Sequence, residues 1–143
     1  MGWSTPKTDW NASYDDAGNY TGDYFNCSDY NRIKENLIYL RAIGMITHPD
    51  FSIKDLGDNK TVEDYLYADE VNLIEETLDT INQHTLNMQY GNTPTFAENG
   101  SMIDAAELNR IEGAILDLYN RITNEAAGRR KFTWNFGMKG GDL

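Results

Sequence analysis

The fold is decided by the stretch YADEVNLIEETLDTINQHTLNM, which covers residues 67–88. Its apolar and small side chains recur at alternating intervals of four and three residues, at Tyr67, Val71, Ile74, Leu78, Ile81, Thr85 and Met88. This spacing places them on one face of an α-helix. Thr61, followed by Asp64, imitates a capping box at the start, and Gly91 and Pro94 are breakers at the end. We therefore expect a long amphipathic helix that opens at Thr61.

Two further segments carry the same pattern. A helix over residues 28–44, with Gly44 as its stop, has a stripe of Tyr30, Ile33, Leu37 and Leu40. A helix that follows Ser101 or Asp104 and ends at Gly128 has a stripe of Leu108, Ile111, Ile115, Leu118 and Ile122. Helices with one apolar stripe each can close a shared core. The sequence predicts a mainly α protein with a three-helix bundle-like body.

A short motif recurs near the start of each expected helix. Residues 29–33, 70–74 and 107–111 all read acid-x-Asn-x-Ile, with aliphatic residues at matching positions further on. Helical packing explains the aliphatic positions. It does not explain the asparagines, which are Asn31, Asn72 and Asn109. Ancient duplication and a packing rule shared by the helices are both compatible with the pattern.

The two ends differ from the body. Residues 1–27 combine aromatic side chains with Gly, Asn, Asp and Ser and have no helical period, which indicates an extended aromatic N-terminal arm. Residues 28–128 form the expected three-helix domain. In residues 129–143, aromatic and polar side chains alternate over residues 132–136, which predicts a short C-terminal β-strand before a flexible tail.

Charge and composition argue against several classes of partner. Lys and Arg number 12 against 23 Asp and Glu, and the net charge of -11 repels phosphate backbones and anionic lipid headgroups. We expect no nucleic-acid and no membrane partner. The sequence shows no apolar run long enough for a signal peptide or a membrane span. The single cysteine, Cys27, cannot form an internal disulfide, which is typical of synthesis in a reducing cytoplasm.

No set of residues assembles a convincing active site, so we expect no enzyme, no catalytic residues and no cofactor. His48 and His84 lie outside the known zinc-ligand spacings, and Cys27 has no motif of a nucleophile. Acidic pairs, including Glu75-Glu76, fall on the expected polar faces of helices, where a solvated surface explains them. Residues 15–23 offer oxygen ligands for calcium without the EF-hand spacing, so a turn is favoured over a metal site.

All the tryptophans lie in the terminal segments and none in the helical stripes. Large aromatic side chains on extended segments bury much area when they anchor into a neighbouring subunit. The residues predicted to bind a partner are Trp3, Trp10, Phe132, Trp134 and Phe136. Packing of these side chains onto the chain's own helices is the alternative.

Several stretches resemble one known family. They read TPKTDW at residues 5–10, DYFN at 23–26 and DYNRIKEN at 29–36, and the likeness continues through residues 67–72, 107–112 and 129–137. In these the sequence resembles small virion proteins of tailed bacteriophages and prophages of Gram-positive bacteria.

The resemblance implies a structural protein of the tail or baseplate, an assembly or attachment scaffold that contacts other virion proteins and copies of itself. It also implies location in the virion after synthesis in the host bacterial cytoplasm. It implies no reaction. The alternative is a host-surface recognition module of the virion, which would bind cell-wall glycan through exposed Tyr and Trp beside acidic groups.

Overall fold

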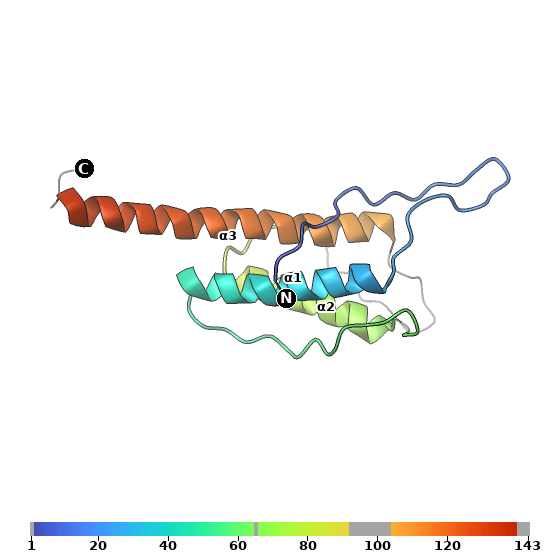
Figure 1. Cartoon of the computed structure of the whole chain (residues 1–143), viewed down its shortest axis with the longest axis horizontal. Coiled ribbons are helices and arrows are strands. Elements are labelled where there is room, and N and C mark those ends of the chain that lie inside the picture. The colour runs from blue at the N-terminus through green and yellow to red at the C-terminus, as the bar shows by residue number, and fades with distance from the viewer. Residues whose placement is uncertain (1, 65, 92–103, 140–143) are drawn as a thin grey trace.

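The computed structural model describes residues 2–64, 66–91 and 104–139. Its helices are α1 (Cys27–Thr47), α2 (Ala68–His84) and α3 (Ala105–Lys139), and each packs against the other two (Figure 1). The prediction of a mainly helical protein with a three-helix body is thus confirmed. Within the described residues, no helix has the length and apolar character needed to cross a membrane.

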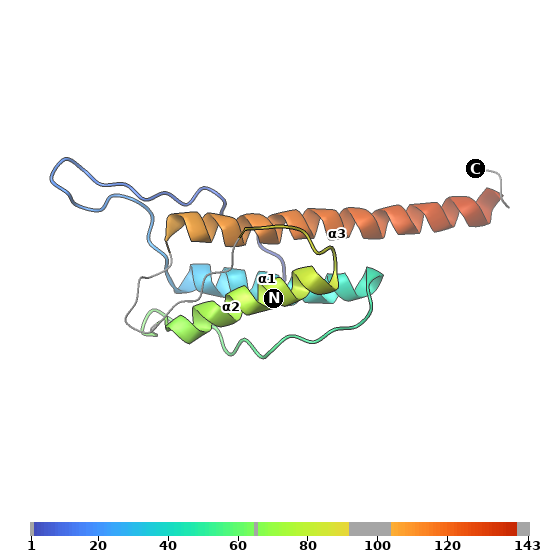
Figure 2. The same ribbon diagram turned by 180° about the vertical axis from the view of Figure 1, so that it is seen from behind.

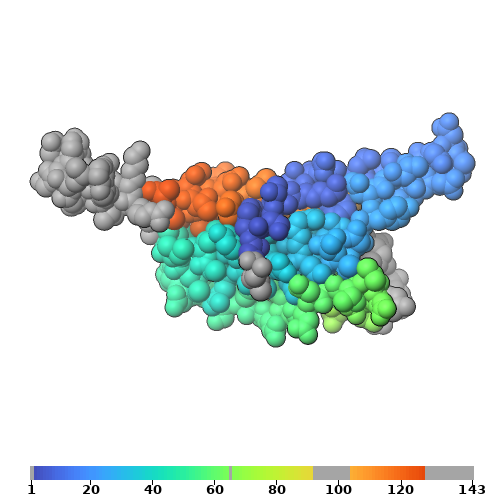
Figure 3. Space-filling model, in the orientation of Figure 1, coloured from blue at the N-terminus to red at the C-terminus, as the bar shows by residue number. Residues whose placement is uncertain are grey.

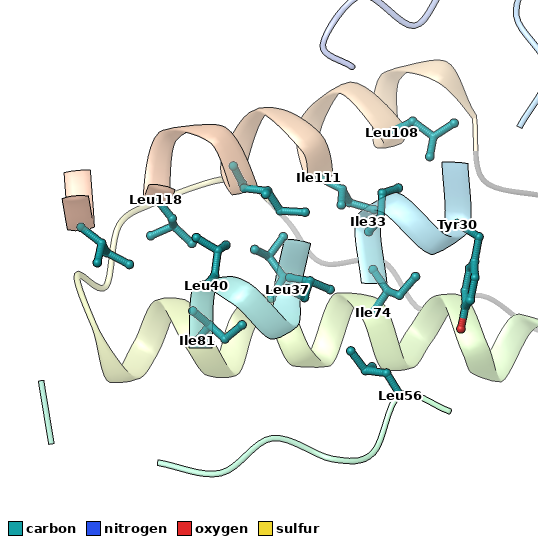
Figure 4. Packing of buried hydrophobic residues seen from close by; sticks show 14 of the residues in the cluster. Tyr30, Ile33, Leu37, Leu40, Leu56, Ile74, Ile81, Leu108, Ile111 and Leu118 are labelled. Carbon is teal, nitrogen blue, oxygen red and sulfur yellow. The ribbon is translucent and has the colours of Figure 1, made fainter. Parts of the chain in front are cut away.

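The core is built from the predicted stripes. Figure 4 shows side chains from all three helices pointing toward one another, with Leu56 reaching in from the segment between α1 and α2. Leu37, Leu40, Ile81, Ile115, Leu118 and Ile122 are fully buried. Phe51 and Trp10 join the same cluster from outside the helices. Burial of these side chains is the main stabilising contribution to the fold.

Helix α1 begins one residue before the expected start and passes through its expected stop. Asn26 caps it, and the backbone N–H of Asn26 in turn donates to Asp29 at 3.0 Å, which completes a capping box. The helix continues through Gly44, so the predicted stop at Gly44 is wrong. A Cβ at Gly44 would lie 3.0 Å from a methyl group of Thr85. This glycine therefore allows close packing against the end of α2 and does not terminate the helix.

Helix α2 is shorter than predicted. Thr61 and Asp64 make the expected bond, 2.7 Å from the Thr61 N–H to Oδ2, but it closes only a turn. The helix starts at Ala68 instead, where the side chain of Glu70 in its first turn accepts a hydrogen bond from the N–H of Tyr67 at 2.9 Å. At the other end Asn87 has a φ of 52°, and the chain turns back along α2. The prediction of one helix from Thr61 to the region of Met88 is therefore wrong at both ends.

Helix α3 passes through Gly128 and ends at Lys139, so the predicted strand at residues 132–136 is wrong. Ala126, Ala127 and the basic residues 129–131 are strong helix formers, and one interior glycine costs only about 1 kcal/mol. A strand would also need a pairing edge. In the described part of the chain the only β pairing is an isolated bridge between Tyr14 and Tyr20. Figure 1 shows the end of α3 extending well beyond α1 and α2.

Residues 2–26 contain no helix and fall into two parts. Residues 2–10, which we call the strap, cross the bundle from α1 to α3, as the dark blue segment in Figure 3 shows. Residues 11–23 form a hairpin that projects from the end of the bundle opposite to the tip of α3 (Figures 1 and 2). The Asp15 carboxylate accepts from the N–H groups of Ala17 and Asn19, at 3.0 and 2.8 Å, and thereby builds the hairpin turn.

Candidate functional site: the clamped strap

Asparagine side chains on the helices hold extended segments of the chain by their backbone. In each case the amide oxygen accepts from a residue's N–H, and the amide nitrogen donates to the same residue's C=O. We call this arrangement an asparagine clamp. It satisfies both backbone groups of one residue, as a neighbouring β-strand would. The pairs are Asn31 with Lys60, Asn36 with Ser4, Asn82 with Met88, and Asn109 with Trp10.

The clamps give the recurring motif of the sequence a physical role. Asn31 and Asn109 occupy equivalent positions in the motif copies of α1 and α3, and both clamp a segment that crosses their helix. The acids of the motif occupy the first turn of each helix, where Asp29 and Glu70 accept a cap N–H. Asn72 also interacts with another residue. The sequence marked these asparagines as unexplained by packing, but it did not reveal what they bind.

The strap is held along its length by α1 and α3. Asn36, which is fully buried, clamps Ser4 with bonds of 2.9 and 2.8 Å. Asn109 clamps Trp10 with bonds of 2.7 and 2.9 Å. Between them, the N–H of Lys7 donates to Oε1 of Glu112 at 3.0 Å. All of these hydrogen bonds go to the backbone of the strap.

Glu112 connects the strap to an ion pair inside the bundle. It is fully buried, and Arg32 donates to both of its carboxylate oxygens, at 2.9 Å from Nε and 2.6 Å from Nη2. Arg32 also donates to Asp29 at 2.8 Å. The indole Nε1 of Trp10 supplies another bond to Glu112, at 2.7 Å. Each oxygen of this buried carboxylate therefore has donors, which is the condition under which such a pair is tolerated.

The two tryptophans of the strap pack onto the chain's own helices. The ring of Trp3 stacks on Tyr119 with centroids 3.8 Å apart and planes at 7°. Trp10 is only 5% exposed and lies beside Phe25, 5.9 Å between ring centroids. Within this chain, both tryptophans therefore pack onto the protein's own helices, which was the alternative to partner binding. Their role in partner binding stays a prediction, and for Trp10 it would require the strap to leave the bundle.

The other predicted partner-binding residues lie near the end of α3. The backbone at Phe132, Trp134 and Phe136 is helical, and their side chains lie outside the described part of the structure. Their partner-binding role also stays a prediction.

A second buried carboxylate lies between α2 and α3. Glu75 is 2% exposed and pairs with Arg110, which also binds Glu107 at 2.8 Å. The assignment of Glu75 to a solvated polar face is therefore wrong, because α3 covers this side of α2. Burial raises the pKa of Glu75, and the bond from Arg110 opposes that effect. Oε1 of Glu75 is buried without a partner.

A polar pocket of about 190 Å³ opens beside this pair. Its lining includes Asp79, Asn82, Tyr90 and Arg110. The hydroxyl of Tyr90 donates to Asp117 at 2.7 Å. Burial is the main cause that raises the pKa of Tyr90, and the bond to Asp117 is the second. The unpartnered oxygen of Glu75 is itself enclosed, so it is not presented to a molecule in the pocket.

The histidines and the cysteine have local contacts of a structural kind. His48 bonds Glu125 at 2.8 Å, while His84 bonds the backbone oxygen of Thr80 at 2.9 Å. Cys27 is a half-buried free thiol at the start of α1. In the described ranges no cluster of three or more His, Cys, Asp or Glu side chains could hold a metal ion.

The hairpin, together with the residue that directly follows it, carries an exposed aromatic cluster that the sequence did not single out as a site. Tyr14 and Tyr24 are 68% and 70% exposed. Their rings meet that of Tyr20 edge to face, with centroids 5.4 and 5.1 Å apart. Exposed aromatic side chains gathered on a projecting element are typical of contact surfaces.

The geometry thus defines a three-helix protein with a clamped strap, a projecting hairpin and a long terminal helix. The chain matches no protein-family model, no curated protein and no solved structure.

Proposed function

We propose that this chain is a structural protein of a bacteriophage virion, of the tail or baseplate, that acts as a scaffold through contacts with other virion proteins and with copies of itself. The observation that carries the proposal is the placement of two projections at opposite ends of one bundle (Figure 1). One is the hairpin, with exposed Tyr14 and with exposed Tyr24 directly after it, and the other is the end of α3. Elements that leave the core gain stability from a neighbour and little from the chain itself.

The use of the buried charged groups supports a scaffold role. Glu112 binds the strap and Arg32, and Glu75 binds Arg110 across the α2 and α3 contact. Both carboxylates therefore connect elements of the fold. The sequence resemblance to small phage virion proteins is the support for the virion and for the tail. Synthesis in the host cytoplasm and location in the particle belong to the same proposal.

Truncation of α3 tests the scaffold role. Among the side chains that the structure describes, the last core residue of α3 is Ile122, so a chain that ends at Gly128 keeps the described core. We expect this truncated chain to melt like the full chain but to lose incorporation into particles. A full-length chain that stays monomeric at all concentrations and is absent from purified particles would contradict the proposal.

The second candidate is recognition of a host cell-wall glycan. The hairpin favours it, because exposed tyrosines lie beside Asp15, Asp16 and Asp23, and aromatic rings next to carboxylates are groups that bind sugars. A glycan array distinguishes the two functions. Saturable binding that is lost in the double variant Tyr14→Ser, Tyr24→Ser supports recognition, whereas the absence of binding supports the scaffold alone.

A further inference from the structure

The strap occupies a site whose hydrogen bonds to the strap backbone all come from the helices. We call it the strap site, and it consists of Asn36, Asn109, Glu112 and Tyr119. These residues contact the backbone of Ser4, Lys7 and Trp10 and the two tryptophan rings, so any strap of the same sequence satisfies them equally. The strap of a second copy is such a segment.

The strap is joined to α1 through the hairpin. The hairpin strands are held by bonds from Asp23 N to Asn11 O, Thr21 N to Ser13 O, and Asp15 N to Asn19 O, at 2.8, 2.8 and 2.9 Å. In the part of the chain that the structure describes, each hydrogen bond formed by residues 11–23 has its partner within residues 7–23. The hairpin is therefore a connector that can change shape without breaking a hydrogen bond to the bundle.

We propose that the strap exchanges between two copies of this chain. The hairpin opens at the turn of residues 15–19, and residues 2–10 of each copy occupy the strap site of the other. Residues 11–26, once extended, span roughly 50 Å at about 3.3 Å per residue, which is enough to reach a neighbouring bundle. The inference rests on the proposed function and deepens it by naming the partner and the contact.

Exchange retains most of the interactions of the closed chain. The clamps, the bonds of Glu112 and the ring stacking of Trp3 form again between copies. The hairpin strands also pair again, because residues 11–14 of one copy meet residues 20–23 of the other. The turn alone changes, and it loses the bonds of the Asp15 carboxylate and the backbone bonds from Gly18 N to Asp15 O and from Asp15 N to Asn19 O. In return, the exposed tyrosine rings come to lie in the junction between copies, where their burial stabilises the dimer.

Photocrosslinking of the full chain tests the exchange directly. Benzoylphenylalanine at position 3 keeps an aromatic ring against Tyr119. Isotopically light and heavy chains are unfolded, mixed and refolded together before illumination, and the crosslinked peptides are identified by mass spectrometry. We expect mixed light and heavy pairs between position 3 and α3, at the frequency that random pairing of copies predicts. The same crosslinker at position 62, where Val62 is 90% exposed, controls for random encounters.

Variants of the turn supply the second measurement. Asp15→Ala removes the carboxylate that holds the turn, and it should raise the dimer association constant by about tenfold in light scattering. Asp16→Ala, at the exposed neighbouring position, is the matched control and should leave the dimer association constant unchanged. Crosslinks confined to pairs of one label overturn the exchange. If chains that show only same-label crosslinks still associate in light scattering, the scaffold proposal stands without strap exchange. If they remain monomeric and are missing from particles, both proposals fail.

Discussion

Trp10 and Glu112 lie 102 residues apart in the sequence, yet the indole Nε1 of Trp10 donates a 2.7 Å hydrogen bond to Oε2 of Glu112. The same carboxylate neutralises Arg32 from α1. A single buried side chain thus joins the N-terminal segment, the first helix and the last helix. The stability of the strap and the stability of the bundle are consequently coupled.

Substitutions of Trp10 should reveal this coupling. Trp10→Phe keeps most of the buried ring but removes the donor to Glu112, and we expect a loss of about 1–2 kcal/mol. Trp10→Ala also removes the ring from the core and should cost about 3–5 kcal/mol. Urea unfolding followed by circular dichroism measures both. Val62→Ala, at a side chain that is 90% exposed, is the control and should unfold like the wild type. An unchanged unfolding midpoint for Trp10→Ala would show that the strap does not stabilise the bundle.

The buried stripe of α2 is tested by Leu78→Asp. Leu78 is 4% exposed, and a carboxylate at this position faces the apolar core without a partner, a change that costs several kcal/mol, about the whole stability of a small domain. We expect an unfolded chain by circular dichroism. Leu78→Met, which conserves apolar volume, should cost less than about 1.5 kcal/mol. A cooperative transition of Leu78→Asp at the wild-type temperature would refute this placement of α2.

The adjacent acids Glu75 and Glu76 form a matched pair. Glu75→Ala leaves Arg110 with Glu107 as its remaining partner and should cost about 1–3 kcal/mol. Glu76 is half exposed and pairs with exposed Lys54, so Glu76→Ala should change stability by less than about 0.5 kcal/mol. Chemical denaturation of the two variants side by side gives the comparison. Equal effects would show that the pair with Arg110 is not buried in solution.

The clamps predict a large effect from a nearly isosteric change. Asn109→Asp replaces the amide nitrogen that donates to the Trp10 carbonyl with an oxygen, so two acceptors face each other. We expect a loss of about 1–3 kcal/mol in thermal or chemical unfolding at neutral pH. Asn120→Asp introduces the same change at an exposed position of α3 and is the control. Similar stability of the two variants would argue against the clamp.

The bond between Tyr90 and Asp117 predicts a pH dependence. Hydrogen bonding from Tyr90, with help from Arg121, holds the pKa of Asp117 below its ordinary value of 3.8. Because the folded-state pKa is the lower one, this stabilisation is present above pH 3.8 and disappears as the pH falls through the folded-state pKa. Asp117→Asn should therefore melt slightly below the wild type at pH 7, and the difference should vanish in strong acid. If the difference in melting temperature persisted in strong acid, the bond between Tyr90 and Asp117 would not be its cause.

The core could be predicted because helical periodicity is a repeating signal. Leu78, Ile111 and their stripe neighbours repeat over several turns, and burial of one face follows from that repetition. Helix ends depend on single contacts instead. Gly44 reads as a stop in the sequence, and only the packing against Thr85 shows why a glycine stands inside α1.

The strap site could be predicted only in part. The recurrence of Asn31 and Asn109 marked them as unexplained by packing, but their partners, Lys60 and Trp10, lie 29 and 99 residues away. Spacing along a sequence carries no information about such distant pairs. The strand prediction failed for a related reason, because alternation over five residues is a weaker signal than the helix propensity of the preceding residues.

The distance in sequence between the strap and α3 also sets an order of events during translation. The ribosome makes Trp10 roughly 100 residues before Asn109 and Glu112, and at about 5–20 residues per second that interval lasts about 5–20 s. For that time the nascent chain has both strap tryptophans and no α3 to receive them. Completed copies of the protein nearby already have a folded α3 that could receive them. A chain is therefore most open to a neighbouring copy before its own last helix has been synthesised.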